Sequence, residues 1–451
     1  MLSNRELRVY NYSCNKKMVK QMNKIFFLSA ALLLGGLTLS SCGDDDDNNS
    51  GNSGTPSEEA YKDRSYGNEA IDACAKTVTA LEAANEVIAT ANLNETQETA
   101  LRQVLTNLVN NVIVPTYTDL ADDVEDLEKT LNGLTVSTIT QTQIDKACTD
   151  FKAARQHWER SEAFLGGAAS DFSIDPTIDS WPLDRAELLD YFKGGMTAEI
   201  EDESTILGFH ALEFILFRNG QNRKVAELQG NDTYKNFEKV SGADELKYAQ
   251  QVCKLLKERC FQLQVAWEGE KNANRVAVVK AAGLDYQTEN GLSYGENLIN
   301  AGVAGSKSTF PALKDAIAQV LSDDEGSCVA ICNEVGTAKI ANPFTNGDIA
   351  YVESPYSYNS ITDFQDNIRS IRNVWFGSLN GNAAQGSFHS FFAGVQKTDV
   401  NTSVEGAFDS AINKIGKMPS PFVKYCSIIW NKDFDDPDNW ESTTEEEEKI
   451  L

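Results

Sequence analysis

The chain is 451 residues long, and its 67 acidic residues against 40 basic ones give a formal net charge of −27 at pH 7. Such a chain lacks the basic footprint that nucleic-acid binding requires, so nucleic acid is excluded as a partner. The length predicts two domains or one duplicated domain, which can bury a core without disulfides.

The N-terminus has the features of an export signal. Its apolar run from Ile25 to Leu39 is shorter than the roughly 20 apolar residues that a membrane-spanning helix needs. Leu39-Ser40-Ser41-Cys42 resembles a lipobox, at which lipoprotein signal peptidase cuts before a lipid-modified cysteine. Residues 1–42 are therefore predicted to be a lipoprotein signal sequence, with lipid on Cys42 as the membrane contact. The predicted location is the outer membrane of a Gram-negative bacterium, on its periplasmic or cell-surface face. An ordinary signal with an incidental cysteine is the alternative.

The segments next to the two ends are strongly polar. Residues 43–58 contain Asp44 to Asp47 and a composition that cannot bury enough apolar surface to fold, which predicts a disordered acidic tether. An acidic run after a lipidated cysteine resembles the surface-export signal of some Gram-negative lipoproteins, and a solvated spacer is the alternative. Residues 441–451, with Glu445 to Glu448, are predicted to be a disordered acidic tail.

Cysteine spacing gives no sign of a structural metal site. Two of the nine cysteines, Cys14 and Cys42, belong to the signal, which leaves an odd number in the body. At least one of these therefore stays free unless it pairs between chains. No CxxC pair is present, so a thiolate zinc site is not expected.

Apolar periodicity in the first part of the body indicates long helices. Asn94 to Gln97 is typical of a capping box, and apolar residues then recur at threes and fours as far as Leu131. This pattern predicts one long helix, kinked at Pro115 and stopped by Gly133. A second helix begins at Thr140, and its apolar stripe extends to Leu165.

The rest of the body also has the pattern of helices. A third helix is expected over 204–217, and a loop-rich connection over 166–196 precedes it. The polar segment 220–243 marks the boundary between an N-terminal helical bundle (59–235) and a C-terminal one (236–440). Helical spacing returns over 246–267 and 363–375, and no strand alternation is found. The predicted fold is all-α.

Two charged residues fall on the apolar stripe of the second helix. Arg155 and Glu162 are seven residues apart on the same face as Trp158. Buried charge is unfavourable unless it is paired, so the two residues either form an internal salt bridge or line a cavity. Glu159, one turn from Arg155, is interpreted as a surface partner.

The third helix has a similar irregularity. His210 and Glu213 are neighbours on one apolar face, where they can reach one metal ion or the carboxylate can orient the imidazole as a base. Gly208 would permit a close approach by another helix or by a ligand. The chain has two other histidines, His157 and His389, so one histidine with several oxygen ligands is expected. Such a site suits iron, manganese or calcium better than tightly held zinc.

Gly208-Phe209-His210-Ala211-Leu212-Glu213 resembles the Gly-x-His-x-x-Glu motif of the imelysin family. The resemblance covers most of residues 60–430, since five further segments are similar to parts of the same family: 114–117, 155–166, 178–184, 353–357 and 363–377. It implies an all-helical fold of two bundle-like halves related by an old duplication, in which 367–377 would correspond to 155–166. The family was named for exported peptidases and includes relatives tied to bacterial iron uptake, where the His and Glu of the motif are proposed metal ligands.

These observations lead to one preferred function. The chain is predicted to be a lipid-anchored envelope protein that binds a metal, iron above all, or a small iron-bearing ligand, and passes it to a transport partner. Zinc, manganese and calcium stay open. The predicted metal ligands are His210, Glu213 and Glu162, and the supporting residues are Arg155, Trp158, Ser161, Asp179, Trp181 and Gly208.

Two other functions stay open at this point. One is a metal-dependent peptidase in which Glu213 and His210 are catalytic. The other is a structural or adhesive surface protein in which the buried polar residues form salt bridges only.

Overall fold

Helices make up almost all of the regular structure. The computed structural model describes residues 56–197, 200, 204–231 and 240–434. Strand structure within these ranges is limited to β1 (Phe217–Arg218), which pairs antiparallel with β2 (Gln221–Asn222). The all-α prediction is confirmed. No helix in the described part is long and apolar enough to cross a membrane.

The predicted signal sequence, Cys42 and the acidic tail lie outside the described residues. The same is true of the predicted tether up to residue 55. The first described helix, α2 (Glu58–Lys62), is capped by Ser57, whose hydroxyl accepts a hydrogen bond from the backbone N–H of Ala60.

The long first helix forms as α4 (Glu95–Leu108), η1 (Val109–Ile113) and α5 (Val114–Leu131). Its predicted capping box is present: Asn94 Oδ1 accepts from Gln97 N at 3.0 Å, and Gln97 Oε1 accepts from Asn94 N at 3.0 Å. The regular α pattern is interrupted by the π-helical turn η1. This turn ends two residues before Pro115, which has no N–H to donate and whose ring crowds the preceding turn.

The second helix, α6 (Gln141–Glu159), begins at the predicted Thr140 cap. Its predicted continuation to Leu165 is wrong, because the chain turns at Arg160 into a short 3₁₀ helix, η2 (Glu162–Phe164). Both the backbone N–H and the hydroxyl of Ser161 donate to Trp158 O, the second at 2.7 Å. This carbonyl would accept from residue 162 in a continuing α-helix, so the serine competes with helix propagation.

The connection over 166–196 holds three short helices: α7 (Ala168–Asp171), α8 (Asp175–Ile178) and α9 (Arg185–Lys193). The helix predicted over 204–217 forms as α10 (Gly208–Leu216) and starts later than residue 204. Its first residue, Gly208, has a φ of +76°, in the left-handed region. A helix cannot continue backward through that conformation.

The other elements follow in chain order. The predicted helical spacing over 246–267 and 363–375 is confirmed by α11 and α16. Besides those already given, the elements are α3 (Ser65–Thr90), η3 (Glu227–Asn231), α11 (Gly242–Glu268), α12 (Ala273–Ala281), α13 (Tyr294–Ile299), α14 (Leu313–Leu321), α15 (Cys328–Glu334), η4 (Val335–Asn346), η5 (Ile349–Tyr351), α16 (Ser360–Phe376), α17 (Phe388–Gly394), α18 (Thr398–Gly416) and α19 (Phe422–Ile429).

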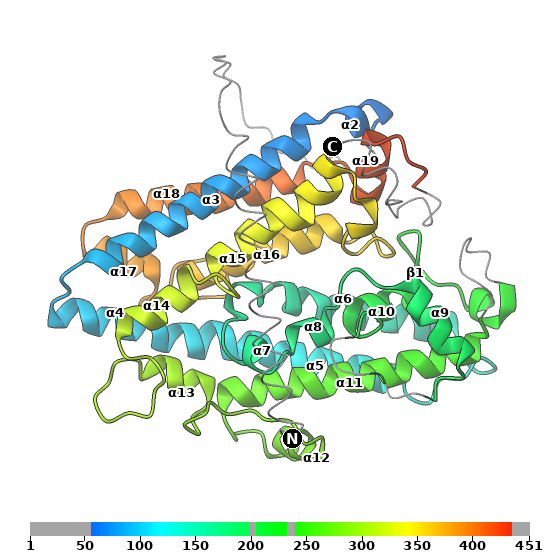
Figure 1. Cartoon of the computed structure of the whole chain (residues 1–451), viewed down its shortest axis with the longest axis horizontal. Helices are drawn as coiled ribbons and strands as arrows, with labels where there is room; N and C mark the ends of the chain where they lie inside the picture. The colour runs from blue at the N-terminus through cyan, green and yellow to red at the C-terminus, as the bar shows by residue number, and fades with distance from the viewer. Residues whose placement is uncertain (1–55, 198–199, 201–203, 232–239, 435–451) are drawn as a thin grey trace, which may run out of the picture. The chain divides into compact units, whose positions relative to one another are not determined.

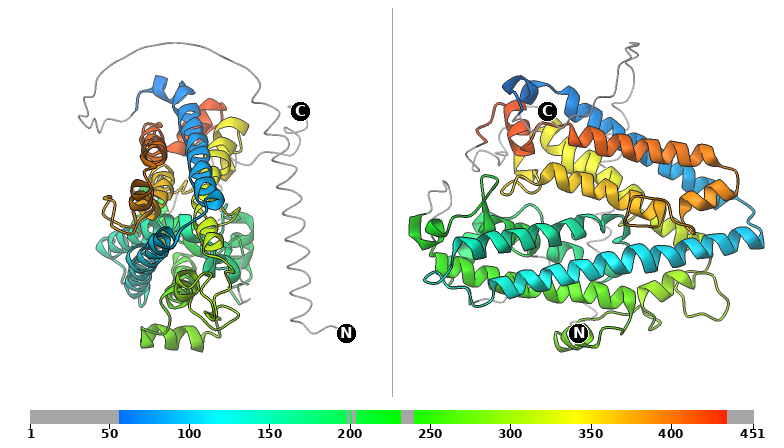
Figure 2. Two further views of the ribbon diagram at one scale, coloured as in Figure 1. Left: turned by 90° about the vertical axis from the view of Figure 1, so that its left-hand side faces the viewer. Right: turned by 180° about the vertical axis from the view of Figure 1, so that it is seen from behind.

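Helices from both ends of the chain share one core. α3 lies along α18, while α5 packs between α6 and α11 (Figures 1 and 2). α16 contacts both α18 and α6, and so connects the two groups of helices. One hydrophobic cluster extends from Tyr61 to Cys426. The domain boundary at 235/236 stays a prediction.

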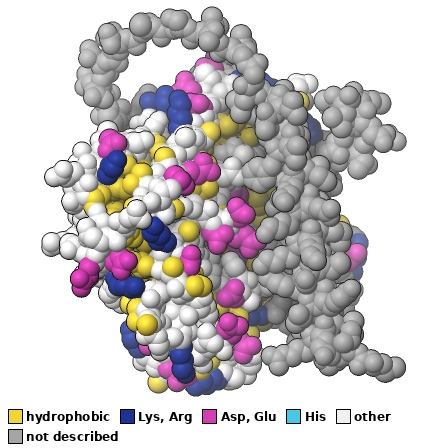
Figure 3. Space-filling model, turned by 60° about the vertical axis from the view of Figure 1, so that its left-hand side comes forward, with side chains coloured by type: hydrophobic (Ala, Val, Ile, Leu, Met, Phe, Trp, Pro, Cys, Tyr) yellow, Lys and Arg dark blue, Asp and Glu magenta, His cyan; other side chains and the backbone are white. Residues whose placement is uncertain are grey.

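The described cysteines form no disulfide, and the face seen in Figure 3 carries charges of both signs. All of the cysteines in the described part are buried and free: Cys74, Cys148, Cys253, Cys260, Cys328, Cys332 and Cys426. On the face seen in Figure 3, acidic and basic side chains are interspersed and no continuous basic patch is visible.

Candidate metal centre

Arg155 lies at the centre of a buried cluster of carboxylates. Its Nη2 is 2.6 Å from Glu353 Oε1 and 2.5 Å from Glu159 Oε1, and its Nη1 contacts Asp179 Oδ1. Glu159 is 0% exposed, so its interpretation as a surface partner is wrong. Glu159 is one helical turn from the buried Arg155 and therefore lies on the same inner face of α6.

Asp179 directly follows α8 and is held from two sides. Its Oδ2 accepts a hydrogen bond from Trp158 Nε1 at 2.8 Å, and its Oδ1 is 3.2 Å from His210 Nε2. Burial opposes the charge of this carboxylate, but the adjacent Arg155 and His210 outweigh burial and hold the pKa of Asp179 well below its usual range. Asp179 is therefore an anion under all ordinary conditions.

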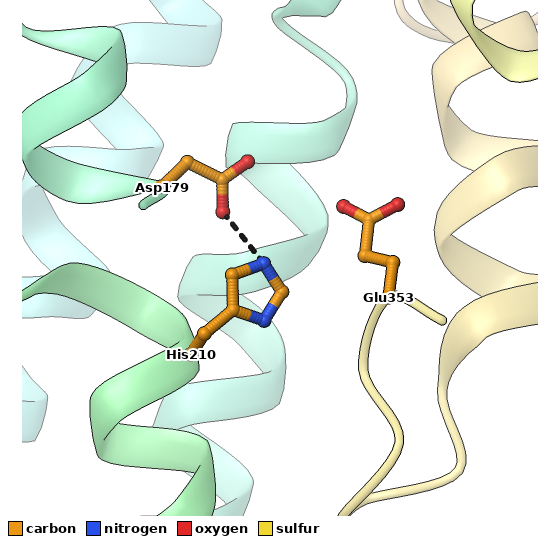
Figure 4. Close-up of side chains that lie close together, drawn as sticks. All are labelled: Asp179, His210 and Glu353. Atoms are coloured by element: carbon orange, nitrogen blue, oxygen red, sulfur yellow. Dashed lines mark ion pairs between the residues drawn. The ribbon is translucent and has the colours of Figure 1, made fainter. Parts of the chain in front are cut away.

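Glu213 fixes the orientation of His210. His210 Nδ1 is 3.5 Å from Glu213 Oε2. Glu213 Oε1 accepts three hydrogen bonds, from Tyr356 N at 3.1 Å, Ser357 N at 2.7 Å and Ser357 Oγ at 2.6 Å. A carboxylate anchored in this way sets which imidazole nitrogen carries the proton and which one faces the cluster. The nitrogen that faces Asp179 is Nε2 (Figure 4).

The protonation of His210 depends on the same contacts. Burial and Arg155 disfavour the imidazolium, but the hydrogen bonds with Asp179 and Glu213 outweigh them and raise the pKa of His210 to about 9. In the absence of a metal the ring is therefore protonated at neutral pH. A metal on Nε2 would have to displace this proton.

Gly208 lets α10 approach the end of α8. A Cβ at this position would lie 2.1 Å from Ile178 O, far inside contact distance. Because Ile178 directly precedes Asp179, this close backbone approach places His210 beside Asp179. Gly208 thus lies where another backbone segment comes close.

The second half of the chain supplies the opposite wall. Glu353 lies between η5 and α16, and its Oε1 is 3.1 Å from Nζ of the buried Lys339 in η4. Asp363 of α16 accepts from Ser354 Oγ at 2.6 Å and lies 3.8 Å from Arg155 Nε. Sequence reasoning noted the segment that begins at Glu353 only as part of the family resemblance, and it missed Lys339 and Asp363.

Two groups of donor atoms are close enough to hold a metal ion. Ligand atoms of Asp179, His210 and Glu353 lie within 4.8 Å of one another, and so do those of Glu159, Glu162 and Asp179 (Figure 4 shows the first group). Of the predicted ligands, His210 belongs to the first group and Glu162 to the second. Glu213 belongs to neither, since it faces the other nitrogen of His210.

Carboxylates outnumber cations in this cluster. Burial raises the pKa of Glu159 and of Glu162 well above the usual range, and raises the pKa of Asp363 to about 7, where Arg155 opposes the shift and Glu353 adds to it. Glu353 Oε2 is buried and has no hydrogen-bond donor in the described part of the chain. The excess of negative charge needs protons or a bound cation, and the donor set of imidazole nitrogen and carboxylate oxygen fits a metal ion.

The other predicted residues lie around this cluster or apart from it. Ser161 Oγ donates to Trp158 O and so supports the tryptophan that binds Asp179. The Trp181 ring packs on Tyr351, with 4.1 Å between centroids. His157 pairs with Asp123 and His389 with Glu405, so a site of three histidines is not formed.

The fold and the site together define the class to which this protein belongs. The chain is a member of the imelysin family, whose profile, described as Imelysin (Peptidase_M75), matches residues 113–442. The resemblance drawn from the Gly-x-His-x-x-Glu motif is thereby confirmed.

Particular relatives are also similar to this chain. Iron-regulated protein A of Synechococcus elongatus is 24% identical over 328 residues, which cover 72% of this chain and 78% of the relative. A crystal structure described as a putative iron-regulated protein A precursor from Parabacteroides distasonis has a TM-score of 0.56 at 23% identity and covers 78% of this chain and 96% of its own. An imelysin-like protein from Psychrobacter arcticum has a TM-score of 0.44 at 12% identity, covering 76% and 94%.

Proposed function

We propose that this protein binds a metal ion, iron, through Asp179, His210 and Glu353. The observation that carries the proposal is the convergence of these three donor atoms within 4.8 Å, inside a buried cluster in which carboxylates exceed cations. A cation bound there would neutralise charge that otherwise needs protons.

The residues around the three proposed metal ligands have separate roles. Glu213 holds His210 with Nε2 toward Asp179, the arrangement by which a carboxylate usually orients a metal-binding histidine. Arg155 keeps the carboxylates together, and because it uses Oε1 of Glu353, the Oε2 atom is left for the metal. Glu162, which the sequence predicted as a ligand, lies in the adjacent carboxylate group.

Iron is the preferred metal for two reasons. One imidazole with several carboxylates suits iron and manganese better than tightly held zinc. The name of the Synechococcus relative, iron-regulated protein A, refers to regulation by iron, which supports a role in iron supply. Iron uptake is accordingly the proposed process, with manganese, calcium and zinc as comparison metals.

We further propose that the protein works in the envelope as a lipoprotein attached through Cys42 and hands its metal to a transport partner. A Cys42→Ala variant should then move from the membrane fraction to the soluble fraction after cell lysis. We also propose that the two halves arose by duplication, with 155–166 corresponding to 367–377; in support, α6 and α16 both contribute residues to the cluster, Arg155 and Asp363.

Calorimetric titration of metal-stripped protein tests the metal site. We expect ferrous or ferric iron to bind the wild type, His210→Ala and Glu353→Gln to weaken binding by at least about a hundred-fold, and His389→Ala to have no effect. His389 is the matched control because it also pairs with a glutamate but lies outside the cluster. Unchanged affinity in His210→Ala would disprove the site.

The structural alternative has one observation in its favour, the dense ion pairing of Arg155. If the cluster serves stability alone, the His210→Ala variant should alter the free energy of unfolding and no metal should stabilise the wild type.

The peptidase alternative is less favoured, because Glu213 Oε1 already accepts three hydrogen bonds and is better suited to orient His210 than to act as a base.

A further inference from the structure

Lys339 is a buried cation beside the proposed metal ligands. Its side chain is 2% exposed, and its Nζ lies 3.1 Å from Glu353 Oε1. Burial opposes the charge of the ammonium group, but the adjacent Glu353, and after it Glu159, outweigh burial and hold the pKa of Lys339 well above its usual range. Lys339 therefore carries a positive charge directly beside a residue that is proposed to bind a metal ion.

Glu353 Oε1 is shared by two cations. Besides Lys339 Nζ, Arg155 Nη2 lies 2.6 Å from this atom, while Glu353 Oε2 has no hydrogen-bond donor in the described part of the chain. A metal ion on Oε2 would be close to both cations, and little water screens the charges because the Glu353 side chain is 1% exposed. Like charges in such surroundings repel strongly. Metal binding is therefore opposed unless one of the two cations moves away.

The two cations differ in how firmly they are held. Arg155 forms ion pairs with four carboxylates: Glu159, Asp179, Glu353 and Asp363. Within the described ranges, Lys339 forms ion pairs with Glu353 and Glu334. Its ammonium group is at the end of a flexible four-carbon chain, whereas the guanidinium of an arginine is a rigid fork. Lys339 is therefore the cation that can move.

Glu334 offers the ammonium group a second place. Glu334 Oε1 lies 3.8 Å from Lys339 Nζ, and the Glu334 side chain is 47% exposed, so it lies on the solvent side of the cluster. Lys339 Nζ is also 6.0 Å from the centroid of the Trp181 ring, a distance at which an aromatic face attracts a cation. By moving from Glu353 toward Glu334, the ammonium group would exchange a buried partner for one that water reaches.

The backbone around Lys339 is irregular. Lys339 belongs to η4, where the chain winds as a π-helix from Val335 to Asn346 and includes Pro343. In an α-helix the N–H of residue 343 would donate to the carbonyl of Lys339, but a proline has no N–H to donate. π-Helical turns are frequent at functional sites, which agrees with a role for Lys339 beyond filling the core.

We infer that Lys339 is an exchangeable counter-cation of the metal centre, which neutralises Glu353 in the metal-free protein and moves to Glu334 when a metal ion binds. The inference rests on the proposed metal function and concerns its regulation. Because metal binding must also separate Lys339 from Glu353, the affinity is lower than the ligands alone would give. When the metal leaves, the ammonium group returns to Glu353, and this return favours release of the metal to a partner.

A double-mutant cycle with ferrous iron tests the exchange. Lys339→Gln removes the charge and keeps an N–H donor for Glu353, so in calorimetric titration of metal-stripped protein it should bind iron at least about ten-fold more tightly than the wild type. Glu334→Gln removes the second partner of Lys339 and should weaken binding by about three-fold or more. Because Glu334 acts through Lys339, the double variant should bind iron as tightly as Lys339→Gln alone.

Lys257→Gln is the matched control for the change of charge. Lys257 also pairs with a glutamate of little exposure, since its Nζ lies 2.7 Å from Glu128 Oε2, but it lies outside the cluster. This variant should leave iron affinity unchanged. A tighter site in Lys339→Gln cannot arise from structural damage, because damage to the cluster would weaken iron binding.

Three results would overturn the inference while the wild type still binds iron. They are unchanged or weaker binding in Lys339→Gln, an equal gain in Lys257→Gln, and an effect of Glu334→Gln that persists without Lys339. Absence of iron binding in both the wild type and Lys339→Gln would instead overturn the proposed function, and the inference with it. A crystal structure of the iron-bound wild type tests the exchange without any variant: Nζ should pair with Glu334, and an Nζ that stays on Glu353 Oε1 would contradict the exchange.

Discussion

Two of the buried guanidinium groups, those of Arg155 and Arg223, lie in very different surroundings. Arg223 forms a two-point ion pair with Glu245 of α11, with Nη1 2.8 Å from Oε1 and Nη2 2.9 Å from Oε2. Arg155 instead shares its guanidinium among carboxylates from four separate segments: Glu159, Asp179, Glu353 and Asp363.

The difference shows what distinguishes a functional cluster from a structural salt bridge. Both carboxylate oxygens of Glu245 meet the Arg223 guanidinium, and Arg218 Nη2 lies 3.7 Å from Glu245 Oε1, so the cations here are sufficient to balance the carboxylate. Around Arg155 the carboxylates exceed the cations, and an oxygen of Glu353 is left without a donor among the described residues. An excess of buried carboxylate oxygens over buried cations, more than burial itself, therefore marks a site for a cation.

The largest expected effect comes from removing each guanidinium. Arg155→Met should lower the free energy of unfolding of metal-free protein by about 3–5 kcal/mol, because it leaves buried carboxylate charge uncompensated. Arg223→Met should lower it by less, because Arg218 Nη2 still lies 3.7 Å from Glu245 Oε1. Added iron should restore stability to Arg155→Met and not to Arg223→Met, as measured by urea unfolding. Equal responses to iron in the two variants would remove the distinction between the two sites.

Gly208→Ala should have the next largest effect. The new Cβ would lie 2.1 Å from Ile178 O, and the alanine would have to adopt the left-handed φ of Gly208. We therefore expect a loss of about 3 kcal/mol in unfolding free energy and a weaker metal site. Gly133→Ala is the matched control, since Gly133 has a φ of +78° but no atom within 4 Å of a Cβ. It should lose only about 1–2 kcal/mol and bind metal normally. Equal losses in the two variants would contradict the close-approach argument.

Glu213→Gln should weaken iron binding by about 10–100-fold with little change in stability. The amide oxygen can still accept from Tyr356 and Ser357, but the amide N–H₂ would donate to His210 Nδ1. The neutral imidazole would then carry its proton on Nε2, the nitrogen that faces Asp179. Titration calorimetry measures the change, and wild-type affinity in this variant would show that Glu213 does not set the orientation of His210.

The smallest effect concerns pH. Burial raises the pKa of Asp363 to about 7, so the folded state binds this proton more tightly than the unfolded state does. The metal-free protein should accordingly lose stability as pH rises from about 4 to about 7, and Asp363→Asn should flatten part of that slope. Urea unfolding at a series of pH values tests this, and parallel profiles for the variant and the wild type would contradict it.

Local sequence patterns predict the long helices α4 to α6, α11 and α16 correctly, but they do not single out α3, α18 or most of the shorter helices. The Asn94 and Thr140 capping boxes and the apolar periodicity that leads to α11 and α16 depend on residues three or four positions apart. The irregularities are harder to foresee. The helix end at Glu159 arises from a side-chain competition at Ser161, and the start of α10 depends on the left-handed backbone at Gly208.

The sequence by itself determined the family, the all-α fold and the pair His210 and Glu213, because each follows from a local motif or a helical period. Only the tertiary structure decided that Glu353, Lys339 and Asp363 complete the site and that Glu159 is buried within it. Glu353, Lys339 and Asp363 reach the cluster around His210 from segments more than a hundred positions away along the chain. Whether these segments come together depends on how α16 packs against α6. The periodicity within one helix shows which face is buried but not which other helix covers that face.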